Sequence, residues 1–177
     1  SVVLNAITAK TGEPTYLYQV LNIIRNKDIR NRFEKTVLYN EPDLINISWE
    51  FFQGEEISGI VAGGNIRCFL KLAGTQYFPD LENRVLFLEG LGTTVESLIT
   101  HLTQLKQMGA FDKIAGLLLG TFTNLEKTYD KHYIYRIVQD FIAKDLPVAK
   151  TSEVGHDINS KILTIGGKIN IKNFQSS

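Results

Sequence analysis

The chain has 177 residues, which is enough to bury a sizeable core without disulfides or metal as staples. Its 19 basic residues balance 19 acidic ones, so no net charge attracts nucleic acid or an anionic membrane surface. The single cysteine excludes an internal disulfide, and no stretch approaches the roughly 20 apolar residues that a membrane span needs. We therefore expect a compact soluble protein that binds neither nucleic acid nor membrane.

The character of the sequence changes near residue 55. Before it, residues 16–39 are rich in Tyr, Asn, Lys and Arg without a regular period, which predicts a connector. Glu41-Pro42-Asp43 predicts a turn ahead of a short strand-like run at 45–52. After it, apolar runs alternate with helical patterns, which is typical of an α/β fold. These runs are Ile57–Ala62, Val85–Leu88, Ile114–Leu119, Val148–Ala149 and Ile162–Ile165.

Two stretches carry apolar residues at helical spacing. The first covers residues 95–108 and is followed by Gly109 as a C-terminal cap, and the second covers 134–142 with Pro147 beyond it as a stop. Both predicted helices should pack on the sheet. The tail at 168–172 alternates with period two, which predicts a half-exposed edge strand.

Three places at predicted strand ends could contribute to a site. Gly63-Gly64-Asn65 lies between a strand and a helix, where backbone amides could face a cleft, although glycines there also serve backbone freedom and close packing. Glu89 ends a buried strand at the edge where ligand sites gather, and a solvated carboxylate is the plainer interpretation. His156 lies in a turn-like stretch, where its own context favours a surface histidine.

Other residues with possible chemistry favour structural roles. His101 and His132 fall within the helical patterns, and Trp49 could line a pocket but also suits a core strand. The apolar neighbours of Cys68 favour a buried thiol over a reactive one. No grouping of His, Asp, Glu or Cys has the spacing of metal ligands, so we expect no metal.

Five separated motifs, taken together in their order, are more informative than any one alone. They are Gly63-Gly64-Asn65-Ile66, the segment 74–80 (GTQYFPD), Leu86-Phe87-Leu88-Glu89, the segment 109–120 (GAFDKIAGLLLG) and Gly155-His156. In this order the sequence resembles the LD-carboxypeptidase family of serine peptidases. That family includes murein tetrapeptide carboxypeptidases and microcin C immunity hydrolases.

The resemblance implies two domains in the parent protein. An N-terminal α/β domain would carry the nucleophilic serine, and a C-terminal mixed α/β domain of swivelling β/β/α type would follow it. In this chain, residues 1–54 would then be the end of the nucleophile domain and the connector, and 55–177 the C-terminal domain. The partner that this arrangement implies is the N-terminal domain itself.

The resemblance also assigns catalytic roles. The family's acid falls on Glu89 and its histidine on His156, which would complete a Ser-Glu-His triad with a serine. Residues 1–12 match the segment that follows the family's nucleophile elbow, with Ser1 on the last Ser or Thr of that elbow. The nucleophile would then lie three residues before Ser1. Because the chain also lacks an initiator Met, we expect it to begin inside a longer protein and to be inactive alone.

The implied activity is that of a serine carboxypeptidase without metal or cofactor, which cleaves the bond to terminal D-alanine in murein tetrapeptides. Cytoplasmic recycling of peptidoglycan and a homodimer are the implied setting and assembly. Gly63, Gly64, Asn65 and Trp49 are the candidate substrate-binding residues. One alternative is a microcin C immunity-type hydrolase of peptidyl or aminoacyl adenylates, with Trp49 as a platform for the base. Another is a non-catalytic binding module, which the residues upstream of Ser1 would distinguish.

Overall fold

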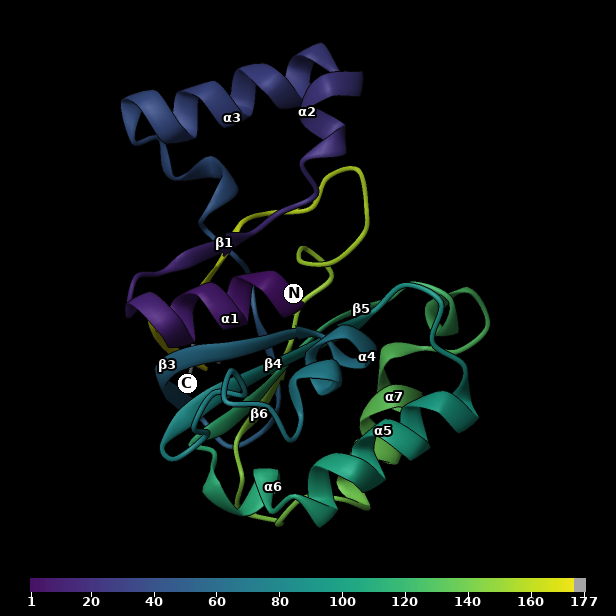
Figure 1. The fold of residues 1–177 in the computed structure, drawn as a ribbon. Helices are drawn as coiled ribbons and strands as arrows, with labels where there is room; N and C mark the ends of the chain where they lie inside the picture. Colours follow the sequence, from purple (N-terminus) through teal and green to yellow (C-terminus); the bar gives the residue numbers. More distant parts are fainter. Residues whose placement is uncertain (174–177) are drawn as a thin grey trace.

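A six-stranded mixed sheet forms the centre of the fold in the computed structural model, which describes residues 1–173 (Figure 1). The strand order is β2-β6-β5-β4-β3-β8, in which the four central strands are parallel and the two edge strands pair antiparallel. The bounds are β2 (Glu50–Gln53), β3 (Glu56–Asn65), β4 (Arg84–Gly90), β5 (Gly116–Phe122), β6 (Val148–Lys150) and β8 (Lys168–Lys172). The predicted α/β class is confirmed, and the expected edge strand at 168–172 is β8.

The inner residues of the central strands are mostly apolar because both faces of the sheet are covered. In β4, Leu86 and Leu88 point into the core beneath the helices, whereas Val85 and Phe87 belong to the core on the opposite face. The helical face is covered by α5 (Val95–Gln107), α6 (Ala110–Lys113) and α7 (Lys131–Gln139). The opposite face is covered in part by β7 (Leu163–Ile165), which pairs with β1 (Thr15–Leu17) in a separate two-stranded sheet.

Both predicted helices are present, but the second is shorter than its pattern. The side chain of Thr94 caps α5 by accepting a hydrogen bond from the Ser97 amide, and the chain turns after the helix at Gly109, whose φ is 68°. Helix α7 ends at Gln139, so the expectation of a helix through residue 142 is wrong. Phe141 and Ile142 lie in the following turn and still pack against the core, so their spacing results from packing rather than from helix.

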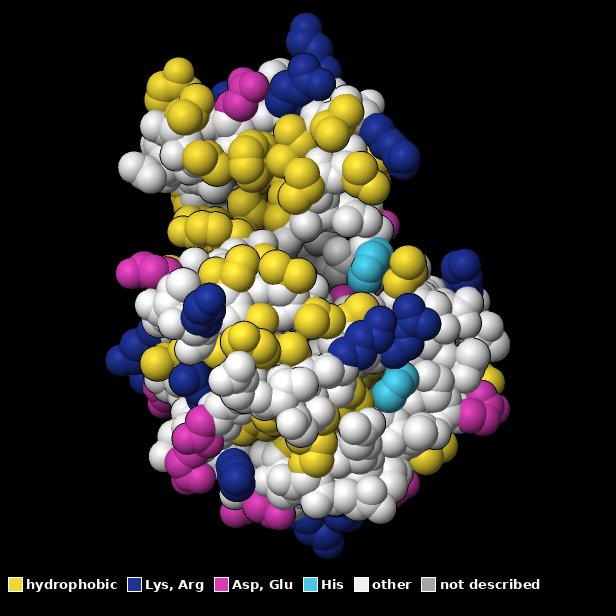
Figure 2. Space-filling view, viewed as in Figure 1, with side chains coloured by type: hydrophobic (Ala, Val, Ile, Leu, Met, Phe, Trp, Pro, Cys, Tyr) yellow, Lys and Arg dark blue, Asp and Glu magenta, His cyan; other side chains and the backbone are white. Residues whose placement is uncertain are grey.

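The chain before residue 55, which includes the predicted connector, contains helices that its irregular period did not indicate. The helices are α1 (Val2–Thr11), α2 (Leu21–Arg25) and α3 (Lys27–Tyr39), followed by a 3₁₀ turn at Pro42–Leu44. Asn26 caps α3 by accepting hydrogen bonds from the amides of Asp28 and Ile29, and Asn40 ends it in the left-handed conformation. Helices α2 and α3 stand apart from the six-stranded sheet, and hydrophobic side chains gather on the face of this unit seen in Figure 2.

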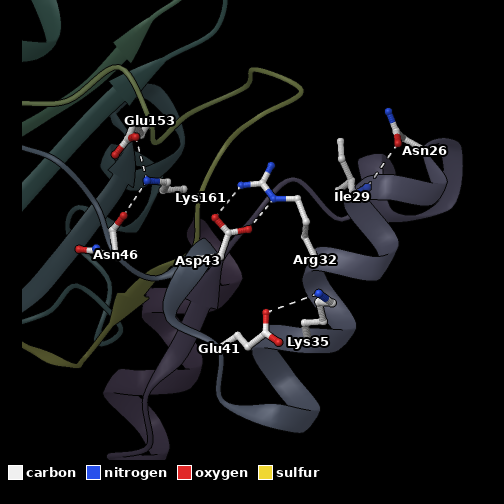
Figure 3. A network of polar contacts seen from close by, with 9 residues as sticks. All are labelled: Asn26, Ile29, Arg32, Lys35, Glu41, Asp43, Asn46, Glu153 and Lys161. Carbon is white, nitrogen blue, oxygen red and sulfur yellow. Dashed lines mark hydrogen bonds and ion pairs between the residues drawn. The ribbon is translucent and has the colours of Figure 1, made fainter.

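A polar network ties the helical unit to the rest of the chain (Figure 3). On α3, Arg32 forms an ion pair of 2.6 Å with Asp43 of the 3₁₀ turn. Beyond that turn, Lys161 donates hydrogen bonds to the carbonyl of Asn46 and to the carboxylate of Glu153. The segment at 153–161 is therefore held against the residues that follow α3.

The remaining helical elements are short. They are α4 (Ile66–Phe69) and the 3₁₀ turns at Leu70–Leu72 and Leu125–Lys127. Of the strand-like run at 45–52, only its last three residues enter β2. Among the helices of residues 1–173, none combines the length and apolar character needed to cross a membrane.

Candidate active site

Glu89 lies at the carboxyl end of the sheet, buried between neighbouring strands. It is 2% exposed, and the register of β3 against β4 places Asn65 opposite it. The carboxyl ends of parallel strands are the usual edge for a ligand site in an open α/β sheet. A carboxylate buried to this extent needs a polar or charged partner.

The partner of Glu89 is His156. Nδ1 of His156 lies 2.8 Å from Oε2 of Glu89, and neither atom has another hydrogen-bond partner among the described residues. The separation has the length of a hydrogen bond. This pairing uses Nδ1 and leaves Nε2 as the ring nitrogen for proton transfer.

The electrostatics of the pair shift the pKa of His156 upward. The hydrogen bond that Nδ1 of His156 donates to Glu89, together with the negative charge of that carboxylate, raises the pKa of His156, while burial of the ring opposes that rise. The net direction is upward. A charge that develops on this ring is therefore stabilised in place.

Close packing of the segment before His156 brings the ring to Glu89. The Thr121 amide of β5 donates to the carbonyl of Val154 at 2.9 Å. A side chain at Gly120 would meet that carbonyl at 2.6 Å, and a side chain at Gly155 would collide with Thr121, so both positions require glycine. On the other side of His156, the side-chain amide of Asn22 donates to the carbonyls of residues 157 and 158, each at 3.2 Å.

A cavity of about 670 Å³ opens over the pair. Its walls come from the chain start, the segment after β1, the turn after β3, the end of β4 and the His156 segment. The lining residues include Ser1, Leu4, residues 16–20, Asn65, Arg67, Cys68, Glu89, residues 91–93, Ser97, residues 154–156 and Ser160. Tyr16, Tyr18 and Gln19 line the cavity although no motif in the sequence marks them as site residues. The local signal is the aromatic content of the segment predicted to be a connector.

Gly63, Gly64 and Asn65 form the end of β3, and this end packs mainly against α1. The side chain of Asn5 donates to the carbonyl of Gly63 at 2.6 Å and accepts from its amide at 3.0 Å. The Asn65 amide donates to Oγ of Ser1 at 2.8 Å. Of the three candidates, Asn65 alone lines the cavity.

Trp49 and Cys68 lie elsewhere than the sequence suggested. Trp49 lines a separate cavity of about 260 Å³ together with Val61 and Ile169, so the structure does not bring it to Glu89 and His156. The expectation of a buried Cys68 is wrong, because its thiol is half-buried. The single turn of α4 places Cys68 on the wall of the larger cavity.

The other two histidines have structural surroundings. His101 lies on α5, with Nδ1 3.3 Å from Oγ of Ser97, and burial together with the charge of Arg67 lowers its pKa. His132 lies in the first turn of α7 and stacks on the ring of Phe52 at 5.2 Å between centroids. Within residues 1–173, no group of three or more His, Cys, Asp and Glu side chains is arranged to hold a metal ion.

Comparison with known proteins identifies similar sequences, and the family model and the curated relatives agree with one another. The family model described as the LD-carboxypeptidase C-terminal domain matches residues 58–171. A protein named putative carboxypeptidase from Treponema pallidum is 27% identical over 97% of this chain and 58% of its own length. The Microcin C7 self-immunity protein of Escherichia coli is 24% identical over 68% of this chain and 36% of its own length.

Solved structures share the fold. A muramoyltetrapeptide carboxypeptidase from Oxalobacter formigenes aligns with a TM-score of 0.76 at 21% identity, over 98% of this chain and 62% of its own. The Microcin C7 self immunity protein in its wild-type apo state aligns with a TM-score of 0.77 at 20% identity, over 97% of this chain and 62% of its own. The chain thus spans about three fifths of the length of these proteins.

Proposed function

Because the chain belongs to the LD-carboxypeptidase family, we propose that it supplies the acid and the base of a serine peptidase active on murein tetrapeptides. The bond cleaved joins an L-configured centre of a diamino acid to terminal D-alanine. The contact of 2.8 Å between Glu89 and His156 carries the proposal. We take the domain division at 54/55, the cytoplasmic setting in wall recycling and the homodimer as parts of the same proposal.

The proposed reaction uses both residues in fixed roles. Nε2 of His156 takes the proton from the serine hydroxyl as its oxygen attacks the scissile carbonyl, and then gives that proton to the departing amine of D-alanine. The acyl-enzyme that forms is hydrolysed by water, which the same nitrogen deprotonates, and the serine recovers its proton. Glu89 holds Nδ1 as the donor and stabilises the imidazolium.

The position of Ser1 supports a nucleophile contributed from upstream. Ser1 lines the cavity that contains Glu89 and His156. Three residues of extended chain span roughly 10 Å, so a serine three positions upstream lies within that distance of Ser1. Oγ of Ser1 itself accepts a hydrogen bond from the Asn65 amide, which suits an anchor better than a nucleophile.

The second candidate is a hydrolase of peptidyl or aminoacyl adenylates. The likeness to the Microcin C7 self-immunity protein favours it, and so do Tyr16 and Tyr18, which line the cavity where a base could stack. Trp49, the platform suggested by sequence, lies outside that cavity. Under this second candidate, Tyr16 and Tyr18 rather than Trp49 would be the platform on which the base stacks.

The test is steady-state kinetics on the full-length protein that carries this chain and the upstream serine. Release of D-alanine from a murein tetrapeptide should exceed hydrolysis of an aminoacyl adenylate, and the reverse order would favour the second candidate. The His156→Ala variant should lose about 10⁴-fold or more in kcat. His101→Ala and His132→Ala serve as matched controls and should stay near wild type. Equal losses in all three variants would reveal a folding effect and sink the assignment.

A further inference from the structure

The lining of the large cavity contains a positive charge that has no role in the proposed triad. Glu89 is its acidic lining residue, and that carboxylate is 2% exposed and paired with His156. Among the described lining residues of the same cavity, Arg67 is the one Lys or Arg. Among the described lining residues, a ligand in the cavity therefore meets the guanidinium of Arg67 without an ion-pair partner. The one lining carboxylate, Glu89, is already paired with His156.

The local structure holds the backbone of Arg67 in place while leaving its side chain free. Its neighbours on α4, Ile66 and Phe69, are both fully buried, and Oδ1 of Asn65 caps the turn by accepting from the Cys68 amide at 3.3 Å. Arg67 is exposed and takes part in none of the ion pairs found within residues 1–173.

No carboxylate among residues 1–173 forms an ion pair with Arg67, so no neighbouring anion neutralises its charge. It contributes to the lowered pKa of His101 on the facing helix α5. Figure 2 shows Lys and Arg side chains beside histidines on this face. Arg67 therefore supplies a cationic side chain to the lining of the cavity that contains Glu89 and His156.

We propose that Arg67 binds the C-terminal carboxylate of the peptide substrate and so sets the exopeptidase specificity of the site. This inference rests on the proposed function. A carboxypeptidase must distinguish a free terminal carboxylate from an internal amide, and the planar fork of arginine matches a carboxylate with two parallel hydrogen bonds. The other polar lining groups, such as Ser97 and Thr93, are uncharged and cannot supply that discrimination.

A phosphate ester would meet the same guanidinium chemistry, so the experiment compares three ligands. The full-length protein is assayed on a murein tetrapeptide ending in D-alanine, on the same peptide ending in D-alaninamide, and on an aminoacyl adenylate. The variants are Arg67→Met and Lys71→Met; Lys71 is an exposed cation of the adjoining 3₁₀ turn that does not line the cavity.

Arg67→Met should lower kcat/KM for the carboxylate peptide roughly 10- to 100-fold, as expected for loss of charge-assisted hydrogen bonds. The amide peptide should change little, so the preference for the carboxylate disappears, and Lys71→Met should retain it. A similar loss on both peptides, or none on either, would overturn the role of Arg67. Loss confined to the adenylate would also overturn it and assign the guanidinium to a phosphate.

Failure of the proposed function has a different signature. If wild type hydrolyses neither peptide, binding of the carboxylate and amide peptides is measured by NMR titration of the wild-type and Arg67→Met proteins. Weaker binding of the carboxylate form alone in the variant supports the recognition role even without turnover. Identical titrations of the two proteins refute it.

Discussion

Replacement of Gly63 by alanine tests whether the glycine pair serves packing or ligand binding. Gly63 has a φ of 119°, which is a left-handed conformation that side chains rarely adopt. A Cβ there would collide with the carbonyl oxygen of Phe87 and lie 3.0 Å from its backbone carbon and nitrogen. Phe87 is the register partner of Gly63 on β4, two residues before Glu89. The new methyl group would therefore force apart the two strands beside the site.

The magnitude follows from two costs. Overpacking against backbone costs about 1–3 kcal/mol, and the strained φ adds about 1–3 kcal/mol. The free energy of unfolding should fall by about 2–6 kcal/mol. Since 1 kcal/mol corresponds to roughly 2–4 °C for a chain of this size, Tm should fall by at least about 4 °C.

Urea and thermal unfolding followed by circular dichroism measure this effect. The matched control is Gly92→Ala, because a Cβ at Gly92 meets no atom within 4 Å and its φ is not left-handed. The control should stay within about 0.5 kcal/mol of wild type. A Gly63→Ala protein as stable as the control would refute the packing argument and return Gly63 to the list of ligand-contacting candidates.

Two further predictions concern the start of the chain and the histidine. The imidazole of His156 should titrate above the ordinary value of about 6.5, and Glu89→Gln should lower its pKa, which NMR measures directly; an unchanged midpoint would contradict the pairing. Because the folded pKa is raised, the stability from this pair is fully present below about pH 6.5 and is lost as pH rises through the folded pKa. A fluorophosphonate should not label Ser1 stoichiometrically, and this chain alone should be inactive. Labelling that disappears on His156→Ala would make Ser1 the nucleophile.

The sheet could be predicted because its residues alternate between two buried faces. A run such as Val85–Leu88 is apolar at every position, and each position has a core to enter. The helical unit could not be predicted in the same way. Within α3 only Ile29 and Thr36 are buried, so its apolar stripe is too narrow to stand out from a polar composition. The better signals were the asparagines at its two ends.

The sequence around Glu89 or around His156 alone does not distinguish a catalytic residue from a surface residue. The physical reason is that the two side chains meet in space although they are far apart along the chain. What joins them is the close approach of the segment before His156 to β5, and this depends on the absence of side chains at Gly120 and Gly155. A single sequence does not reveal such an approach from spacing. The resemblance to a family supplied the pair, and the catalytic role of both residues stays a prediction.

The walls of the site link both parts of the predicted division at 54/55. Ser1 and residues 16–20 line the cavity from the first part, whereas Glu89 and His156 line it from the second. The same first part also holds the histidine segment, through the hydrogen bonds of Asn22 to residues 157 and 158. The segment at 16–39 therefore helps to hold the residues that follow His156. The position of His156 therefore depends on residues that would be called a connector by composition alone.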